Sequence, residues 1–186
     1  LNVDYKAGTI QINPATLTVK TEGAKRAYNG KPLTAEGTIT GFVNGETAKF
    51  TVTGSQTTVG QSQNTYNIDW KAKDTTAKKG NYTISEDLGD LVVTQFAEKI
   101  TVTTTGGKFT YDGNAHGATV AVTGLPAGYT VETATSDATA TDVTEKAVKA
   151  ECDHLVIKDD QGKDVTSELN VDYKAGTIQI NPATLT

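Results

Sequence analysis

The residues best suited to chemistry in this 186-residue chain stand together as Cys152-Asp153-His154. A thiol beside an imidazole and a carboxylate is the residue set of a nucleophile activated by a base. The apolar residues around it occupy opposite phases of a strand, with Val148 and Ala150 before it and Leu155 and Ile157 after it. This break predicts a β-bulge near Asp153-His154, with Cys152 turned inward as a small hydrophobic residue.

Two internal crosslinks are alternatives that the sequence disfavours. A thioester between Cys152 and Gln179 needs an inward glutamine, but Gln179 alternates with apolar neighbours and is expected to face away from the core. A Lys–Asn isopeptide bond needs a Lys on an early strand and an Asn on the last. Lys20 has no Asn partner in residues 91–94, and the second module has Asn181 but threonine instead of Lys at positions 101 and 103. We therefore expect neither crosslink.

Acidic and histidine residues could bind a metal ion. Asp159, Asp160 and Asp164 surround the turn Gln161-Gly162, but their spacing is not the alternating acidic loop of calcium sites. A turn followed by a helix N-cap at Asp164 explains the same residues. His116 stands in a loop without a second ligand near it in sequence, so it is expected to be exposed.

Three further motifs have structural interpretations. Gly106-Gly107-Lys108 lacks the remaining residues of a phosphate-binding loop and is typical of a turn between strands. Asn81-Tyr82-Thr83 fits a glycosylation acceptor but is also a strand that enters the core. Trp70 could anchor a ligand, but it alternates in phase with Ile68 and Ala72, which favours the core. We thus predict no catalytic, cofactor-binding or metal-binding residues, and assign no ligand-binding residue.

Composition excludes several classes of partner. The net charge is −5, with both signs mixed along the chain, so no basic block is present to bind a phosphate backbone. No apolar run is long enough to span a bilayer. A single cysteine excludes an internal disulfide framework. We expect no nucleic-acid partner, no membrane insertion and no cofactor.

The chain begins with LNVDYKAGTIQINPATLT, and the same letters recur without change as residues 169–186. Identity over this length indicates a tandem array, of which the chain holds one full period and the start of another. A weaker repeat lies inside that period. When Tyr28-Asn29-Gly30 is aligned with Tyr111-Asp112-Gly113, Gly45 falls on Gly128 without a gap; we call this the module alignment. The period is therefore expected to contain two diverged copies of one module.

Apolar and polar residues alternate in many short runs, which is typical of half-buried strands. The clearest run is residues 65–73, and shorter ones recur in both halves of the chain. Turn dipeptides such as Asn44-Gly45 separate the runs. Only residues 75–79 and 164–168 suggest helix, each about one turn. The sequence predicts a mostly β fold: two related β-grasp-like or sandwich-like modules in tandem, with at most short helical turns.

These repeats set the expected domain boundaries. Residues 1–14 form the closing strand of a preceding repeat, 15–94 the first β module, 95–181 the second, and 182–186 the start of the next repeat. The joints between modules are short, and the Asn-Pro joint is stiff because proline fixes φ. Short, stiff joints between compact modules predict an elongated monomer with little contact between its modules.

Several motifs of the first module resemble those of the MBG and YDG-type tandem repeats of bacterial surface adhesins. They are the Tyr-Asn-Gly turn at 28–30, Thr-Gly-Phe-Val-Asn-Gly-Glu-Thr at 40–47, Gly-Asn-Tyr-Thr-Ile at 80–84 and Gly-Asp-Leu-Val-Val-Thr at 89–94. The second module keeps Tyr111-Asp112-Gly113 and is more distant elsewhere. The resemblance implies β-rich stalk domains strung between a distal binding domain and a cell-wall anchor, and it implies no catalytic residues.

From the repeat and the resemblance we expect a non-enzymatic stalk segment of a bacterial cell-surface adhesin. It would be extracellular and attached to the cell wall, and its partners would be the adjacent identical repeats in the same polypeptide. It would act as a spacer that projects a distal binding region. The alternative is that the repeats themselves are weak, multivalent adhesive modules that bind a host glycan or protein. A recurring exposed aromatic or acidic patch would favour this alternative.

Residues 1–12 raise a separate expectation. They carry Val3, Tyr5, Ile10 and Ile12 but have no module of their own to close. An apolar strand without a core is seldom ordered. We therefore expect it to pair, either on a sheet edge of a neighbouring molecule or in exchange for residues 169–181.

Overall fold

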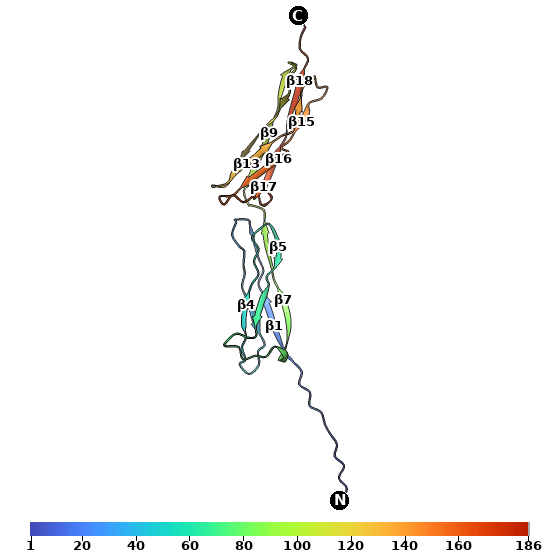
Figure 1. Cartoon of the computed structure of the whole chain (residues 1–186), viewed down its shortest axis with the longest axis vertical. Helices are drawn as coiled ribbons and strands as arrows, with labels where there is room; N and C mark the ends of the chain where they lie inside the picture. Colours follow the sequence, from blue (N-terminus) through green and yellow to red (C-terminus); the bar gives the residue numbers. More distant parts are fainter. Residues whose placement is uncertain (186) are drawn as a thin grey trace. The chain divides into compact units, whose positions relative to one another are not determined.

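A computed structural model describes residues 1–185, which divide into two compact units. Among these residues, unit 1 comprises Leu1–Arg26 and Lys31–Val93, and unit 2 comprises Ala27–Gly30 and residues 94–185. The fold is mostly β (Figure 1). Within the described residues the helical structure is limited to two single 3-10 turns, which agrees with the expected fold class.

Residues 15–94 form eight strands in three small sheets. Their bounds are β1 (Ala15–Thr21), β2 (Ala24–Ala27), β3 (Gly37–Thr40), β4 (Lys49–Val52), β5 (Gly60–Gln63), β6 (Tyr66–Asp69), β7 (Tyr82–Leu88) and β8 (Asp90–Thr94), with the 3-10 turn η1 (Lys79–Asn81) before β7. The sheets have the orders β3-β1-β7, β2-β8-β5 and β4-β6. In the first of them, β1 pairs antiparallel with β3 and parallel with β7.

Residues 95–181 form ten strands. Their bounds are β9 (Lys99–Thr105), β10 (Gly107–Thr110), β11 (His116–Gly117), β12 (Thr119–Thr123), β13 (Thr130–Thr135), β14 (Thr139–Ala140), β15 (Val148–Ala150), β16 (His154–Lys158), β17 (Asn170–Lys174) and β18 (Gly176–Asn181), with η2 (Thr166–Glu168) before β17. The sheets have the orders β12-β9-β17, β10-β18-β15, β13-β16 and β11-β14.

The eight strands of residues 15–94 each have a counterpart among the ten strands of residues 95–181. β12-β9-β17 repeats β3-β1-β7, with the same antiparallel and parallel pairings. β10-β18-β15 repeats β2-β8-β5, and β13-β16 repeats β4-β6. Even the two-stranded β11-β14 has a counterpart in the isolated antiparallel bridge between Leu33 and Gln56. The two segments that the module alignment relates near their starts thus have the same topology.

The core follows from the alternation of the strands. β1 buries Leu17, Val19 and Thr21, and β8 buries Leu91 and Val93. Their counterparts in unit 2 are buried in the same phase: Ile100, Val102 and Thr104 on β9, and Ile178 and Ile180 on β18. Burial of one face per strand is the pattern expected of small packed sheets.

Glycines allow two chain segments to cross closely where they pass between sheets. A Cβ on Gly89, between β7 and β8, would lie 2.3 Å from the backbone nitrogen of Gly23, between β1 and β2. In unit 2 a Cβ on Gly106 would lie 2.1 Å from the carbonyl oxygen of Thr177, and one on Gly176 would lie 2.5 Å from that of Thr104. Backbones this close leave no room for a side chain, so both units need glycine at the crossing.

Several local expectations need correction. The strand expected at residues 65–73 ends at Asp69, because the chain then turns and Lys71 N–H bonds the Asp69 carboxylate at 2.9 Å. The helical turn expected at 75–79 lies at Lys79–Asn81 instead. The bulge expected near Asp153-His154 is wrong: residues 151–153 link β15 to β16, and the irregular register lies in β13, between Val131 and Thr133.

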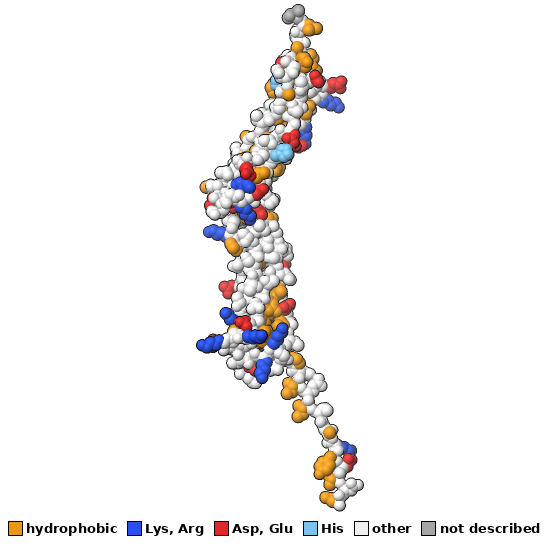
Figure 2. Space-filling view, in the orientation of Figure 1, with side chains coloured by type: hydrophobic (Ala, Val, Ile, Leu, Met, Phe, Trp, Pro, Cys, Tyr) orange, Lys and Arg blue, Asp and Glu red, His pale blue; other side chains and the backbone are white. Residues whose placement is uncertain are grey.

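Residues 1–14 form no strand in the structure. Figure 1 shows them as an extended chain that leads away from β1, and Figure 2 shows hydrophobic side chains along it. Ile10 and Ile12 are 95% and 90% exposed. Residues 169–181 occupy their own place in unit 2, in β17 and β18. Within one chain, residues 1–12 therefore pair with no strand, and their pairing with a second copy stays a prediction.

Candidate functional site

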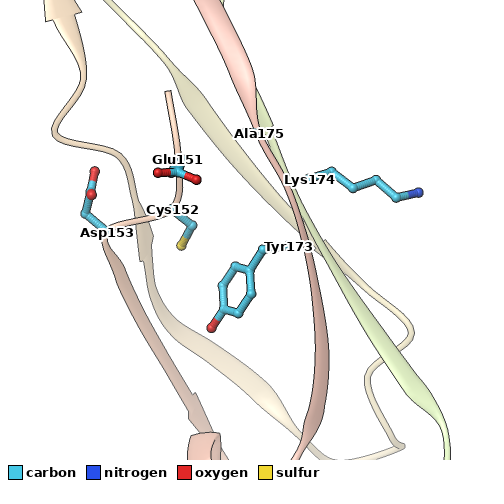
Figure 3. Close-up of a pocket in the computed structure, with 6 residues that line it drawn as sticks. All are labelled: Glu151, Cys152, Asp153, Tyr173, Lys174 and Ala175. Atoms are coloured by element: carbon cyan, nitrogen blue, oxygen red, sulfur yellow. The ribbon is translucent and has the colours of Figure 1, made fainter. Parts of the chain in front are cut away.

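Cys152 lines a pocket of about 340 Å³ in unit 2, together with Glu151, Asp153 and residues 173–175. Figure 3 shows its sulfur directed toward the ring of Tyr173 on β17, whereas Lys174 points away from it. The Cys152 thiol lies 3.5 Å from the backbone oxygen of His154, so it contacts the main chain of the histidine. Burial, the largest cause, and the nearby Asp153 raise the pKa of the thiol. A more protonated thiol is a weaker nucleophile at neutral pH.

The base that would activate Cys152 is engaged elsewhere. The Nε2 atom of His154 lies 2.9 Å from a carboxylate oxygen of Asp137. Asp153 accepts a hydrogen bond from the Asp137 backbone N–H at 2.7 Å. The three residues therefore form a polar link between β16 and the 136–138 loop, and nothing in their geometry activates the sulfur. Cys152 is half-buried rather than fully inside.

A second pocket of about 340 Å³ lies in unit 1, along a groove between β6 and β7. It is lined by Thr65, Tyr66, Asn67, Ile68 and Trp70 on one side, by Ile84, Glu86 and Leu88 on the other, and by Lys79. Both strands end their sheets, so the groove runs between two sheet edges. We call this groove between two sheet edges the seam. By the strand correspondence, the Cys152 pocket lies at the seam of unit 2, between β16 and β17.

The groove in unit 1 presents aromatic and hydrogen-bonding groups. The hydroxyl of Tyr66 donates to the carboxylate of Glu86. Burial and this bond raise the pKa of Tyr66 to about 12, so the phenol stays protonated at neutral pH. Trp70 is half-buried: it packs on the core residue Tyr82, with ring centroids 6.3 Å apart, and it also lines the groove. Such a lining suits binding better than catalysis.

Two of the three carboxylates that could hold calcium, those of Asp159 and Asp164, serve as turn acceptors instead. Asp159 accepts the backbone N–H groups of Gln161 and Lys163, both at 2.9 Å. Asp164 accepts the N–H of Thr166 at 3.0 Å and its hydroxyl at 2.7 Å, and these two bonds lower its pKa. The cap position of η2 is Val165, one residue after the expected Asp164. No group of three or more His, Cys, Asp or Glu side chains in residues 1–185 is placed to hold a metal ion.

His116 differs from its expected exposed state. Its ring stacks on Phe109 with centroids 4.0 Å apart, and its Nε2 lies 3.0 Å from the carboxylate of Asp112. This bond helps to lower the pKa of Asp112, after the larger effect of the Asn114 backbone N–H. Both partners are close to His116 in sequence, so the site orders the turn that contains Tyr111-Asp112-Gly113. The sequence does not predict this contact, because Asp112-Gly113 is a turn dipeptide that accounts for the aspartate without a partner.

The other motifs stand apart from one another. Lys20 is exposed and pairs with Glu22 at 3.6 Å. Gln179 pairs with Lys108 across the β10–β18 ladder. Gly106, two residues before Lys108, lies at the chain crossing described above. Within Asn81-Tyr82-Thr83 only Tyr82 is buried, and its hydroxyl donates to Glu46 at 2.5 Å.

No helix among the described residues is long and apolar enough to cross a membrane. The seam between β6 and β7, with its counterpart between β16 and β17, remains the candidate site on geometric grounds. Comparison of the chain with protein-family models, curated proteins and solved structures finds no match.

Proposed function

We propose that the chain is a non-enzymatic stalk segment of a bacterial cell-surface adhesin, in which tandem repeats act as a spacer that projects a distal binding region. The observation that carries the proposal is the repeat itself: the opening residues 1–18 recur unchanged as residues 169–186, and the period contains two segments of the same strand order. In such arrays each repeat contacts only its neighbours, so reach grows with the number of repeats. The resemblance to MBG and YDG-type repeats supplies the surface location.

The length of the array tests this function. A module of this size is about 30 Å across, so each period should add about 60 Å. Chains with one, two and three periods can be compared by small-angle scattering and electron microscopy. We expect the maximum dimension to increase by a constant amount per period. A one-period chain with a radius of gyration of about 16 Å, the value for a single compact sphere, would contradict the proposal.

A second function is favoured by the groove between β6 and β7. Because it presents Tyr66 and Trp70 next to polar groups, it offers an aromatic surface that would recur in every period. Weak sites repeated along an array gain avidity without a new contact. This supports the adhesive alternative, with a host glycan or protein as ligand. Binding of a three-period chain to a glycan array or to mucin, lost on Tyr66→Ala with the fold intact, would support it. Unchanged binding, or none at all, would leave the repeats as spacers only.

A further inference from the structure

Residues 27–30 cluster with unit 2, and of these four residues only Tyr28 is buried. Tyr28 is 2% exposed, and its backbone N–H donates to the carbonyl oxygen of Thr94 at 2.8 Å. Burial is the main cause of the raised pKa of its hydroxyl, and Tyr129, Glu168 and Asp159 add to it. Tyr129 belongs to the turn at residues 126–129 and Glu168 ends η2, so both segments lie within electrostatic range of the Tyr28 hydroxyl.

The corresponding place in unit 1 is an open pocket. The module alignment and the strand order match residues 126–129 with 43–46, and η2 with η1. A pocket of about 330 Å³ lies there, lined by residues 12–15, Val43, Gly80 and Asn81. Val43 is 45% exposed. Unit 2 thus buries Tyr28 at this place. Unit 1 has a cavity with an exposed apolar rim at the corresponding place.

Unit 2 carries a matching turn that no module encloses. Tyr111-Asp112-Gly113 corresponds to Tyr28-Asn29-Gly30, and Gly113 and Gly30 have φ of 78° and 76°. The N–H of Tyr111 donates to the carbonyl oxygen of Asn181 at 2.8 Å, as that of Tyr28 does to Thr94. Yet Tyr111 is 43% exposed. The turn is already ordered, because Asp112 accepts the Asn114 N–H at 2.9 Å and pairs with His116.

The sequence joins the turn to the pocket. Residues 180–183 read Ile-Asn-Pro-Ala, and so do residues 12–15, which line the pocket. The residue that accepts the Tyr111 N–H, Asn181, is therefore the counterpart of Asn13 in the pocket wall. Wherever one copy of the repeat runs directly into the next, these two residues are one and the same. The backbone bond to it then brings the Tyr111 side chain to the mouth of the pocket of the following copy.

We propose that the pocket formed by residues 12–15, Val43, Gly80 and Asn81 binds the Tyr111-Asp112-Gly113 turn of a preceding copy of this repeat. The inference rests on the proposed function only in taking the repeats as contiguous. It specifies how consecutive modules join: the tyrosine of each Tyr-Asp/Asn-Gly turn is buried by the module that follows it. The motif is then a docking element, and every module donates its turn to the module that follows and accepts the turn of the module before.

The test uses a two-period chain, in which residues 1–168 are followed by residues 1–186. Tyr111 of the second copy is changed to Phe, so that only the first copy reports at this position. Tyrosines are acetylated with N-acetylimidazole and located by mass spectrometry. We expect Tyr111 of the first copy to react at least tenfold more slowly than Tyr111 of the single-period chain. Tyr28 should be protected in both chains, which verifies folding, and Tyr173, 56% exposed, should react in both.

A substitution in the acceptor makes the test specific. Val43→Lys in the second copy places a charge at the rim of the pocket and should restore the reactivity of Tyr111. Val143→Lys in the same second copy is the matched control, because Val143 is 46% exposed and lies outside the pocket. Equal reactivity of Tyr111 in one-period and two-period chains would overturn the inference, as would protection that survives Val43→Lys. If the two-period chain still shows the expected increase in length, the spacer function stands while the docking fails.

Discussion

The two units close the same end of the same fold with different chemistry. In unit 1 the first residue of β7, Tyr82, is buried against Trp70 and Phe42, and its hydroxyl bonds Glu46. In unit 2 the corresponding residue is Leu169, which is 2% exposed, and the buried side chains nearest to it in sequence are Glu168 and Val165. At this position one unit buries a polar-tipped aromatic residue and the other an aliphatic one.

The difference teaches which features the fold requires. The parallel and antiparallel pairings and the close chain crossings are common to both units, so they define the module. The filling of the end and of the seam differs between them, so that part is free to diverge. Equivalent substitutions at shared positions should therefore lower the stability of the two units by similar amounts. Substitutions at divergent positions should have an effect that is specific to one unit.

The largest effect is expected at the chain crossings. Gly89→Ala in unit 1 and Gly106→Ala in unit 2 each place a methyl group within 2.4 Å of backbone atoms, so each should lower the free energy of unfolding by about 3 kcal/mol or more. Denaturant unfolding followed by circular dichroism measures the loss. Gly80→Ala, with nothing within 4 Å of its Cβ, is the control. A large loss in one unit and none in the other would break the equivalence of the crossings.

A smaller effect, confined to unit 1, is expected at its aromatic end. Trp70→Ala removes a half-buried ring that packs on Tyr82, and it should cost about 2–3 kcal/mol, below the roughly 3–5 kcal/mol of a fully buried tryptophan. Trp70→Phe should cost less. Thermal unfolding followed by far-ultraviolet circular dichroism reports the change. An unchanged midpoint for Trp70→Ala would mean that the ring serves the groove rather than the core.

Much of the fold could be predicted from the sequence, because alternation and repetition are local signals. The alternation of Leu17 and Val19 predicts their burial, and the module alignment pairs Tyr28 with Tyr111. What surrounds those two tyrosines was not predictable, since burial depends on the neighbouring chain and not on the motif. The seam was missed for a similar reason: Tyr66 and Glu86 lie 20 residues apart, and only the sheet topology brings them together.

The contribution of the seam of unit 1 to stability can be measured through its pH dependence. The pKa of Tyr66 is about 12 in the folded chain and 10.0 when unperturbed, so its protonated form stabilises unit 1. That contribution is fully present below pH 10 and is lost as pH rises from 10 to 12. We expect the free energy of unfolding to fall over this range, and to fall less in Tyr66→Phe. Following phenol ionisation by ultraviolet absorbance should show one late transition that the variant lacks. If the transition that the variant lacks lies near pH 10 instead, the Tyr66–Glu86 bond is contradicted.

The smallest effect is expected at the unit 2 seam. Cys152→Ala removes a small, half-buried group and should change the free energy of unfolding by no more than about 1–2 kcal/mol. Because the pKa of the thiol is raised, iodoacetamide should alkylate it more slowly at pH 8 than a cysteine in an unfolded peptide. Faster alkylation, or loss of ligand binding with the fold preserved, would assign a reactive role to Cys152.

The parallel pairing of the first and penultimate strands has a consequence under load. β1 and β7 run side by side in register from Ala15 opposite Tyr82 to Thr21 opposite Leu88, and β9 and β17 do the same in unit 2. Tension applied between the two ends of such a module pulls the paired strands lengthwise past each other. All the hydrogen bonds of the ladder are then strained together, whereas a hairpin pulled from its open end loses them one at a time. The topology thus makes rupture under shear a concerted event.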